Sequence, residues 1–199
     1  MQLKEIYNEE IFYSIMKLLH QEYGHTYSNE RIKAELQDLI DKKIILCCFF
    51  DNKEMIGHIS YKRPESTDKV CSVVSVFINQ EYRNKGLGKL MMTEFELYAK
   101  KLKFKQIMLG ARRGREGFYY SCGFSGEALV QYKKEYFKKE FIENILVEKN
   151  ISKYKYVYQD NLYHKFYFDA KCVNVLYPII DKMADKIELI IIFSKMLKN

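Results

Sequence analysis

A basic turn that contains two glycines is the part of this sequence best suited to hold a charged ligand. It consists of Arg83, Asn84, Lys85, Gly86, Leu87, Gly88 and Lys89. Glycines let a backbone turn sharply and come close to a ligand, and the N-terminus of a helix offers unpaired N–H groups and a partial positive charge. The arginine and the two lysines add full charges. These residue types at this spacing predict an anion site, and a phosphate suits it.

The segments on either side of the turn have the patterns of a buried strand and an amphipathic helix. Residues 70–79 form an apolar, β-branched run, and apolar residues recur at helical spacing over 86–102. The strand and the helix would hold the glycines between them. The turn lacks the GK[ST] of a P-loop and the third glycine of a dinucleotide fingerprint, which disfavours nucleoside triphosphates and NAD.

A second motif, FYYSCGF at residues 118–124, follows about thirty residues later. In this order the two motifs resemble the GCN5-related N-acetyltransferase (GNAT) superfamily, whose Arg/Gln-x-x-Gly-x-Gly/Ala loop holds the pyrophosphate of acetyl-CoA. The resemblance covers about residues 1–130. It departs at Asn84, where glycine is common, and at Gln80, where proline is common. Asparagine tolerates a left-handed backbone, so we expect the turn to survive.

The resemblance implies a coenzyme site and one catalytic residue. The implied coenzyme-binding residues are Val76, Phe77, Ile78, Arg83, Asn84, Lys85, Gly86, Leu87, Gly88 and Lys89, the first three through their backbone. Tyr119 matches the position whose phenol in many members protonates the leaving thiolate. A tyrosine packed in the core is the alternative, and both stay open. The strand before the turn offers only Ser72 and Ser75 where the family often has a glutamate base.

The chain has the element order of the acetyltransferase core. After a short first strand we predict helices over 9–22 and 28–41 (with Ser28 as a cap), strands over 44–50, 55–61 and 70–79, a helix over 86–102, a strand over 105–111 and a helix over 114–121. Beyond residue 130 we predict a helix over 133–147, a hairpin from the alternating residues of 154–158 and 162–168, and a strand over 187–193. The fold class is α/β with a mixed sheet. We expect one domain over 1–199, in which residues 131–199 are a C-terminal extension that completes the sheet.

Length and composition also predict a single core, since the chain has 199 residues, of which 48% are hydrophobic. The formal charge of +7 is concentrated near the turn, because residues 81–117 contain ten Lys and Arg against four acids. Four of the six arginines lie there, and a planar guanidinium suits phosphate. For Arg112, Arg113 and Arg115, a coenzyme contact and a solvated basic face remain equally open.

Several classes of site and location are disfavoured. The five cysteines and four histidines show no metal-ligand spacing, so we expect no metal and interpret the cysteines as packing thiols. No apolar stretch is long enough to cross a bilayer, and the N-terminus lacks the apolar region of a signal peptide. We therefore expect a cytoplasmic protein without a membrane partner.

The leading hypothesis is an N-acetyltransferase that moves the acetyl group of acetyl-CoA to a primary amine by direct attack in a ternary complex. The acceptor would be a small molecule or a peptide amine, and a homodimer is left open. The alternative is a non-catalytic protein of the same fold that binds or senses acyl-CoA, because no general base is evident. The basic, tyrosine-rich composition also suggests nucleic-acid binding. That reading is disfavoured because the aromatic residues alternate in strand-like runs and the charge gathers around the turn.

Overall fold

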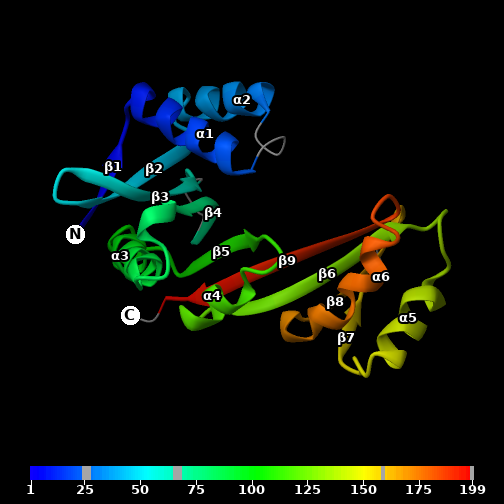
Figure 1. Ribbon diagram of the computed structural model, residues 1–199. Coiled ribbons are helices and arrows are strands. Elements are labelled where there is room, and N and C mark those ends of the chain that lie inside the picture. The colour runs from blue at the N-terminus through cyan, green and yellow to red at the C-terminus, as the bar shows by residue number, and fades with distance from the viewer. Residues whose placement is uncertain (24–27, 65–68, 158–159, 198–199) are drawn as a thin grey trace. The chain divides into compact units, whose positions relative to one another are not determined.

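The structure is a computed structural model that describes residues 1–23, 28–64, 69–157 and 160–197. It divides into two compact units (Figure 1). The first comprises Met1–Ile107 with Met196–Asn199, and the second comprises Met108–Lys195. Strand β5 (Gln106–Ala111) leads from the first unit into the second.

The first unit combines an antiparallel sheet with α-helices and a short 3₁₀ helix. Its elements are β1 (Gln2–Ile6), α1 (Glu9–Tyr23), α2 (Asn29–Ile40), β2 (Ile44–Asp51), β3 (Glu54–Lys62), β4 (Val70–Ile78), the short 3₁₀ helix η2 (Gln80–Tyr82) and α3 (Leu87–Lys101). The strands follow the order β1-β2-β3-β4, each antiparallel to the next. The sequence predicted these strands and the three α-helices with bounds that differ by a residue or two, because each has a clear apolar period.

Helices α1 and α2 cover one face of this sheet. Their apolar stripes form one buried cluster with strand side chains, made of Phe12, Ile15, Met16, Leu19, Leu36, Leu39, Leu46, Cys48 and Phe77. The N-terminus of α2 is capped as predicted, because the Ser28 hydroxyl accepts a hydrogen bond from the Arg31 N–H at 3.3 Å.

Helix α3 is attached to the sheet by an apolar stripe and by one polar chain. The stripe consists of Met91, Met92, Phe95 and Ala99. Tyr98 donates a hydrogen bond to Glu5 on β1, and its hydroxyl lies 3.2 Å from that of Tyr61 on β3. Leu102, the last residue of the predicted helix, is 47% exposed because the helix ends at Lys101. The contacts of α3 also position the turn that precedes it.

The second unit is a sheet built around β6. Its elements are α4 (Glu116–Ser121), β6 (Ser125–Lys133), α5 (Lys139–Glu148), β7 (Tyr154–Tyr156), β8 (Tyr163–Asp169), the 3₁₀ helix η3 (Ala170–Val175), α6 (Tyr177–Asp181) and β9 (Ile187–Met196). The strand order is β5-β9-β6-β8-β7. Strand β6 pairs antiparallel with both β8 and β9, so strands of the C-terminal extension complete this sheet.

The sequence predictions for the extension were partly wrong. The helix expected over 133–147 begins only at Lys139, because β6 keeps pairing with β8 as far as Lys133. Helix α6, which has a proline in its first turn, was not predicted. The hairpin is confirmed, since Tyr156 on β7 lies opposite Phe166 on β8. Tyr158 falls outside the described residues. Among those described, no helix is long and apolar enough to cross a membrane.

Candidate functional site

The turn before α3 has the backbone that its residues predicted. Asn84 and Gly86 are left-handed, with φ of 60° and 76°. Gly86 is the N-cap of α3, where no side chain caps the helix and the first turn holds no acidic residue. The Leu90 N–H donates a hydrogen bond to the Gly86 carbonyl at 3.1 Å. The N–H groups of the residues between them have no partner within the helix and point out of its N-terminus. A Cβ on Gly86 would meet no atom within 4 Å, so this end is open to an anion such as phosphate.

Strand β4 leads to the turn, and its pairing with β3 has two special features. The register shifts at one point, and the two backbones come very close at another. Its register with β3 shifts next to Ser60, as occurs at bulges, which are common beside active sites. Gly57 on β3 pairs with Ile78, and a Cβ there would lie only 2.5 Å from the Phe77 carbonyl oxygen. The Phe77 side chain is 6% exposed and belongs to the core, so only its backbone is available to a ligand.

The Arg83 side chain contacts the end of β4 and so links the turn to this strand. Its Nε donates a hydrogen bond to the Ile78 carbonyl at 2.8 Å, and its guanidinium carbon lies 5.3 Å from the centre of the Phe77 ring. These contacts give Arg83 a positioning role. Asn84, Lys85 and Lys89, by contrast, are exposed.

Tyr119, in the second unit, lies on α4 and is 8% exposed. Its ring centre is 5.2 Å from that of Phe193 and 6.1 Å from that of Phe124. The Gly-Phe part of the motif ends the helix, because Gly123 is left-handed and the Phe124 N–H bonds to the Tyr119 carbonyl at 3.1 Å. The ring therefore packs in the core, and the role of the phenol stays a prediction.

The sequence matches the acetyltransferase (GNAT) family over residues 12–124, which is more than half of the chain. The chain belongs to this family. No curated protein matches the sequence significantly.

Solved GNAT acetyltransferases share this fold at low sequence identity. An aminoglycoside 6'-N-acetyltransferase complexed with coenzyme A has 12% identity and a TM-score of 0.55 over 100% of this chain and 98% of that one. A spermidine N-acetyltransferase SpeG chimera from Vibrio cholerae and hSSAT has 16% identity and a TM-score of 0.53 over 87% and 99%. Tetrahymena GCN5 has 13% identity and a TM-score of 0.52 over 84% and 96%. The fold is thus the GNAT fold with a C-terminal elaboration.

Instead of an acidic residue, this GNAT chain has a buried histidine against β4. The Nε2 atom of His58 lies 3.0 Å from the Ser75 hydroxyl, its ring stacks on Phe77, and its Nδ1 has no partner in the described part of the chain. Burial lowers the pKa of His58 to about 3, so the imidazole is neutral at pH 7 and too weak a base for an amine. His58 was not predicted as a partner of Ser75, although it is a buried polar residue next to Ile59 in a largely apolar strand.

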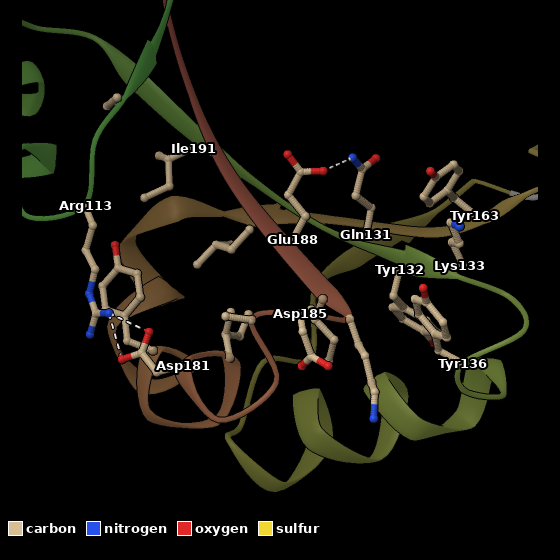
Figure 2. Close-up of a pocket in the computed structure, with 17 residues that line it drawn as sticks. Arg113, Gln131, Tyr132, Lys133, Tyr136, Tyr163, Asp181, Asp185, Glu188 and Ile191 are labelled. Atoms are coloured by element: carbon tan, nitrogen blue, oxygen red, sulfur yellow. Dashed lines mark hydrogen bonds and ion pairs between the residues drawn. The ribbon is translucent and has the colours of Figure 1, made fainter. Parts of the chain in front are cut away.

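The second unit contains a cavity of about 460 Å³, shown in Figure 2. Its lining comes from the end of β5 and the following loop, from β6, β8, α6 and β9, and from the loops beside them. It belongs mostly to the C-terminal extension, where no site residue was predicted.

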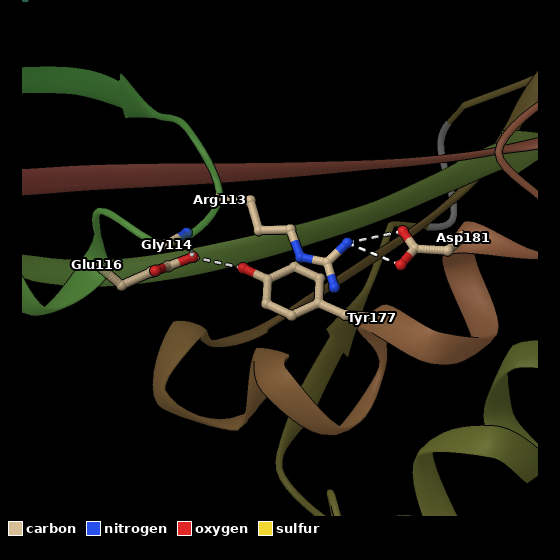
Figure 3. A network of polar contacts seen from close by, with 5 residues as sticks. All are labelled: Arg113, Gly114, Glu116, Tyr177 and Asp181. Carbon is tan, nitrogen blue, oxygen red and sulfur yellow. Dashed lines mark hydrogen bonds and ion pairs between the residues drawn. The ribbon is translucent and has the colours of Figure 1, made fainter.

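Arg113 forms one wall of this cavity through a polar network (Figure 3). Its Nη1 donates to both carboxylate oxygens of Asp181 at 2.8 Å, and its guanidinium carbon lies 3.8 Å from the centre of the Tyr177 ring. The Tyr177 hydroxyl donates to Glu116, which also accepts from the Gly114 N–H. Burial and the bond to Glu116 raise the pKa of Tyr177, which keeps this phenol protonated. The structure thus gives Arg113 a specific contact with the extension.

Three buried cysteines and the metal-ligating residue types were considered as further sites in the described part of the chain. Burial raises the pKa of Cys47, Cys48 and Cys71 to about 12, so these thiols do not ionise near neutral pH. Within the described ranges, no three His, Cys, Asp or Glu residues are placed to hold a metal ion, and His25 lies outside those ranges.

Proposed function

We propose that this protein transfers the acetyl group of acetyl-CoA to a primary amine by direct attack in a ternary complex. The observation that carries the proposal is the turn at 83–89, whose left-handed Asn84 and Gly86 lead into an uncapped helix N-terminus in a chain of the GNAT family. The positive end of α3 and the exposed Lys85 and Lys89 suit a pyrophosphate.

The other residues take roles that follow from their positions. Bound acetyl-CoA would supply the acetyl group as a thioester. The backbone of Val76 to Ile78 binds the pantetheine arm and offers N–H groups to the developing oxyanion. Tyr119 holds the proton for the leaving thiolate on its phenol oxygen. His58 is too weak a base and β4 holds no carboxylate, so the amine passes its proton to water or arrives already neutral.

The similar structures suggest which acceptors to test first. Two of them are acetyltransferases of an aminoglycoside and of spermidine, both polycationic amines. Amines of this kind come first in an activity panel, with peptide amines second.

The second candidate is a protein that binds acyl-CoA without turnover, favoured by the absence of a carboxylate on β4. Release of coenzyme A thiol, measured with the amine panel, separates the two functions. Tight binding of the coenzyme without release of coenzyme A thiol in the presence of any amine would favour the protein that only binds acyl-CoA.

The coenzyme site itself is tested with Gly86→Val. A β-branched side chain is strained at φ 76° and would extend into the space in front of the helix, so we expect binding of acetyl-CoA to be abolished. Asn52→Val is the control, because it places the same strain at φ 54° in an exposed hairpin of the same unit. Titration calorimetry gives both affinities. A folded Gly86→Val protein that binds as the wild type does would show that the turn is not the site.

A further inference from the structure

Strand β4 is accessible over a short stretch that contains one polar side chain, that of Ser75. Burial alternates along the first four residues of β4, as is usual for a strand with one buried face. The alternation stops at Ser75 and its two neighbours, all three of which are partly exposed. The pairing with β3 shifts at the same place, because Ser60 lies opposite Ser75 whereas Tyr61 lies opposite Val73. Strand β4 thus has one extra residue before Ser75, as in a β-bulge.

The extra residue places the Ser75 side chain on the same face of the sheet as His58. Residues directly opposite each other in an antiparallel pair share a face, and so do alternate residues of one strand. Ser75 lies opposite Ser60, and Phe77 lies opposite His58. The contacts agree with this, since the Nε2 atom of His58 is 3.0 Å from the Ser75 hydroxyl oxygen and its ring stacks on Phe77 with 5.6 Å between the ring centres. The two strands therefore bring a histidine and a serine together.

A histidine at position 58 lowers the stability of the fold. Its side chain is 0% exposed, and its Nδ1 atom has no hydrogen-bond partner in the described part of the chain. A buried polar atom without a partner destabilises a fold, and a leucine would fill a similar space without that cost. Among the described residues, the imidazole makes its hydrogen bond with Ser75. That bond is what the histidine adds beyond packing.

The missing partner at Nδ1 also determines which ring nitrogen of His58 carries the proton. Burial lowers the pKa of His58 to about 3, so at pH 7 the ring is neutral and has one N–H and one bare nitrogen. A buried N–H group without an acceptor is rarer in proteins than a buried acceptor without a donor. The proton therefore lies on Nε2, and the Nε2–H donates to the Ser75 oxygen.

This direction of the hydrogen bond leaves the hydroxyl proton of Ser75 for another acceptor. A hydroxyl group has one O–H donor, and a protonated Nε2 cannot accept from it. Ser75 makes no other hydrogen bond with any described residue, and it is partly exposed. Its O–H is therefore available to a ligand. A carbonyl oxygen is the matching ligand group, whereas a protonated amine can only donate.

Ser75 directly precedes the backbone of Val76 to Ile78, which is proposed above to bind the pantetheine arm. We propose that Ser75 donates a hydrogen bond to a carbonyl oxygen of bound acetyl-CoA and that His58 positions the Ser75 hydroxyl for this contact. Ser75 has this role only if β4 holds the coenzyme as in the proposed function. The oxygen belongs either to the acetyl thioester or to an amide of the pantetheine arm, and both share this chemistry.

Titration calorimetry of the full chain without any amine tests this contact, with acetyl-CoA and coenzyme A as the two probes. Ser75→Ala should weaken binding about two- to tenfold, the usual range for one neutral hydrogen bond. A loss confined to acetyl-CoA identifies the thioester carbonyl, and an equal loss with both probes identifies a pantetheine amide. Ser60→Ala is the matched control and should keep both affinities, because Ser60 lies opposite Ser75 but is only 8% exposed. Wild-type affinity of Ser75→Ala for both probes would overturn the proposal.

The positioning role of His58 is tested by measurements that do not use acetyl transfer. Nitrogen NMR of the imidazole ring should show the proton on Nε2, and a proton on Nδ1 would overturn this role. His58→Gln keeps an N–H near the place of Nε2, so it should bind acetyl-CoA within about twofold of the wild-type affinity. His58→Leu should lose affinity as Ser75→Ala does. Equal affinities of the two variants at position 58 would show that His58 only packs.

Failure of this contact and failure of the proposed function give different results. Coenzyme binding that depends on Ser75, without acetylation of any amine, would remove the transferase proposal and keep this one. Acetyl transfer together with unchanged coenzyme affinity in Ser75→Ala would keep the transferase proposal and remove this one. If His58→Leu does not fold, the Ser75→Ala affinities and the NMR of the wild type decide.

Discussion

At the scale of single residues, variants of two adjacent tyrosines can distinguish a catalytic role from a packing role. Tyr119 and Tyr120 both pack against Phe193. We expect Tyr119→Phe to lower the maximal rate about tenfold or more, which is the low end of general-acid effects. Coenzyme affinity should be nearly unchanged, because phenylalanine keeps the ring contacts. Steady-state kinetics and calorimetry on the same protein measure both.

Tyr120→Phe is the matched control for this experiment. The Tyr120 hydroxyl is buried without a hydrogen-bond partner in the described structure, so its removal should be neutral or stabilising. The rate should stay at the wild-type value. If Tyr119→Phe also keeps the full rate, Tyr119 is only a packing residue.

The buried His58 predicts a pH dependence of stability. Burial lowers the pKa of His58 from 6.5 to about 3. As the pH falls below 6.5, His58 therefore binds a proton in the unfolded chain but not in the folded chain. The stability present above pH 6.5 is therefore lost from that pH down to about 3, with a slope that approaches about 1.4 kcal/mol per pH unit. Between pH 7 and pH 5 the loss from this residue is about 2 kcal/mol.

His58→Leu should remove this part of the pH dependence, as measured by urea unfolding at pH 7 and pH 5. His20→Gln changes an exposed histidine on α1 and should keep the wild-type profile. A variant at position 58 that loses as much stability on acidification as the wild type would show that the fold does not lower the pKa of this imidazole.

At the scale of elements, the end of β4 depends on a glycine in the neighbouring strand. A Cβ at Gly57 would lie 2.5 Å from the Phe77 oxygen and 2.7 Å from Ile78 Cδ1, and the pairing of the two strands prevents an easy shift. We expect Gly57→Ala to lower the free energy of unfolding by about 1–3 kcal/mol. It should also weaken acetyl-CoA binding, because the displaced backbone at 76–78 is the one proposed to hold the pantetheine arm.

Gly110→Ala provides the comparison within a strand. A Cβ there meets no atom within 4 Å, so the change in stability should stay within about 0.5 kcal/mol. Equal thermal stability of the Gly57 and Gly110 variants would mean that β3 can move away from β4 at little cost.

At the scale of the whole molecule, we propose that the chain folds as one domain and that residues after 130 cannot be removed. A protein that ends at residue 130 would cut β6 and remove both of its partners, β8 and β9. The remaining edge and its apolar face would be exposed, so this shortened protein should be insoluble or unfolded. Circular dichroism and sedimentation test it.

The full-length chain should then melt in a single cooperative transition in calorimetry. The two compact units divide at Ile107 and Met108 and not at residue 130, so a fragment that ends at 130 matches neither of them. Two well-separated transitions in the intact chain would contradict the single-domain proposal.

The sequence by itself determined the features whose causes are local. The left-handed turn follows from Asn84 and Gly86, the helix after it from its apolar period, and the cap of α2 from Ser28. The order of strands and helices up to residue 121 follows from the same periods. Each of these depends on residues within a few positions of one another, and backbone preferences act over that range.

The tertiary structure alone decided which distant side chains meet. Arg113 and Asp181 are 68 residues apart, and His58 and Ser75 are 17 apart on neighbouring strands. Strand β6 runs on to Lys133, where a helix was predicted to begin, because β8 offers it backbone partners. The cavity beside Arg113 arises in the same way, since its lining comes from several strands and helices. No local sequence pattern predicts such contacts, because they form only when strands pair and elements pack that are far apart in the chain.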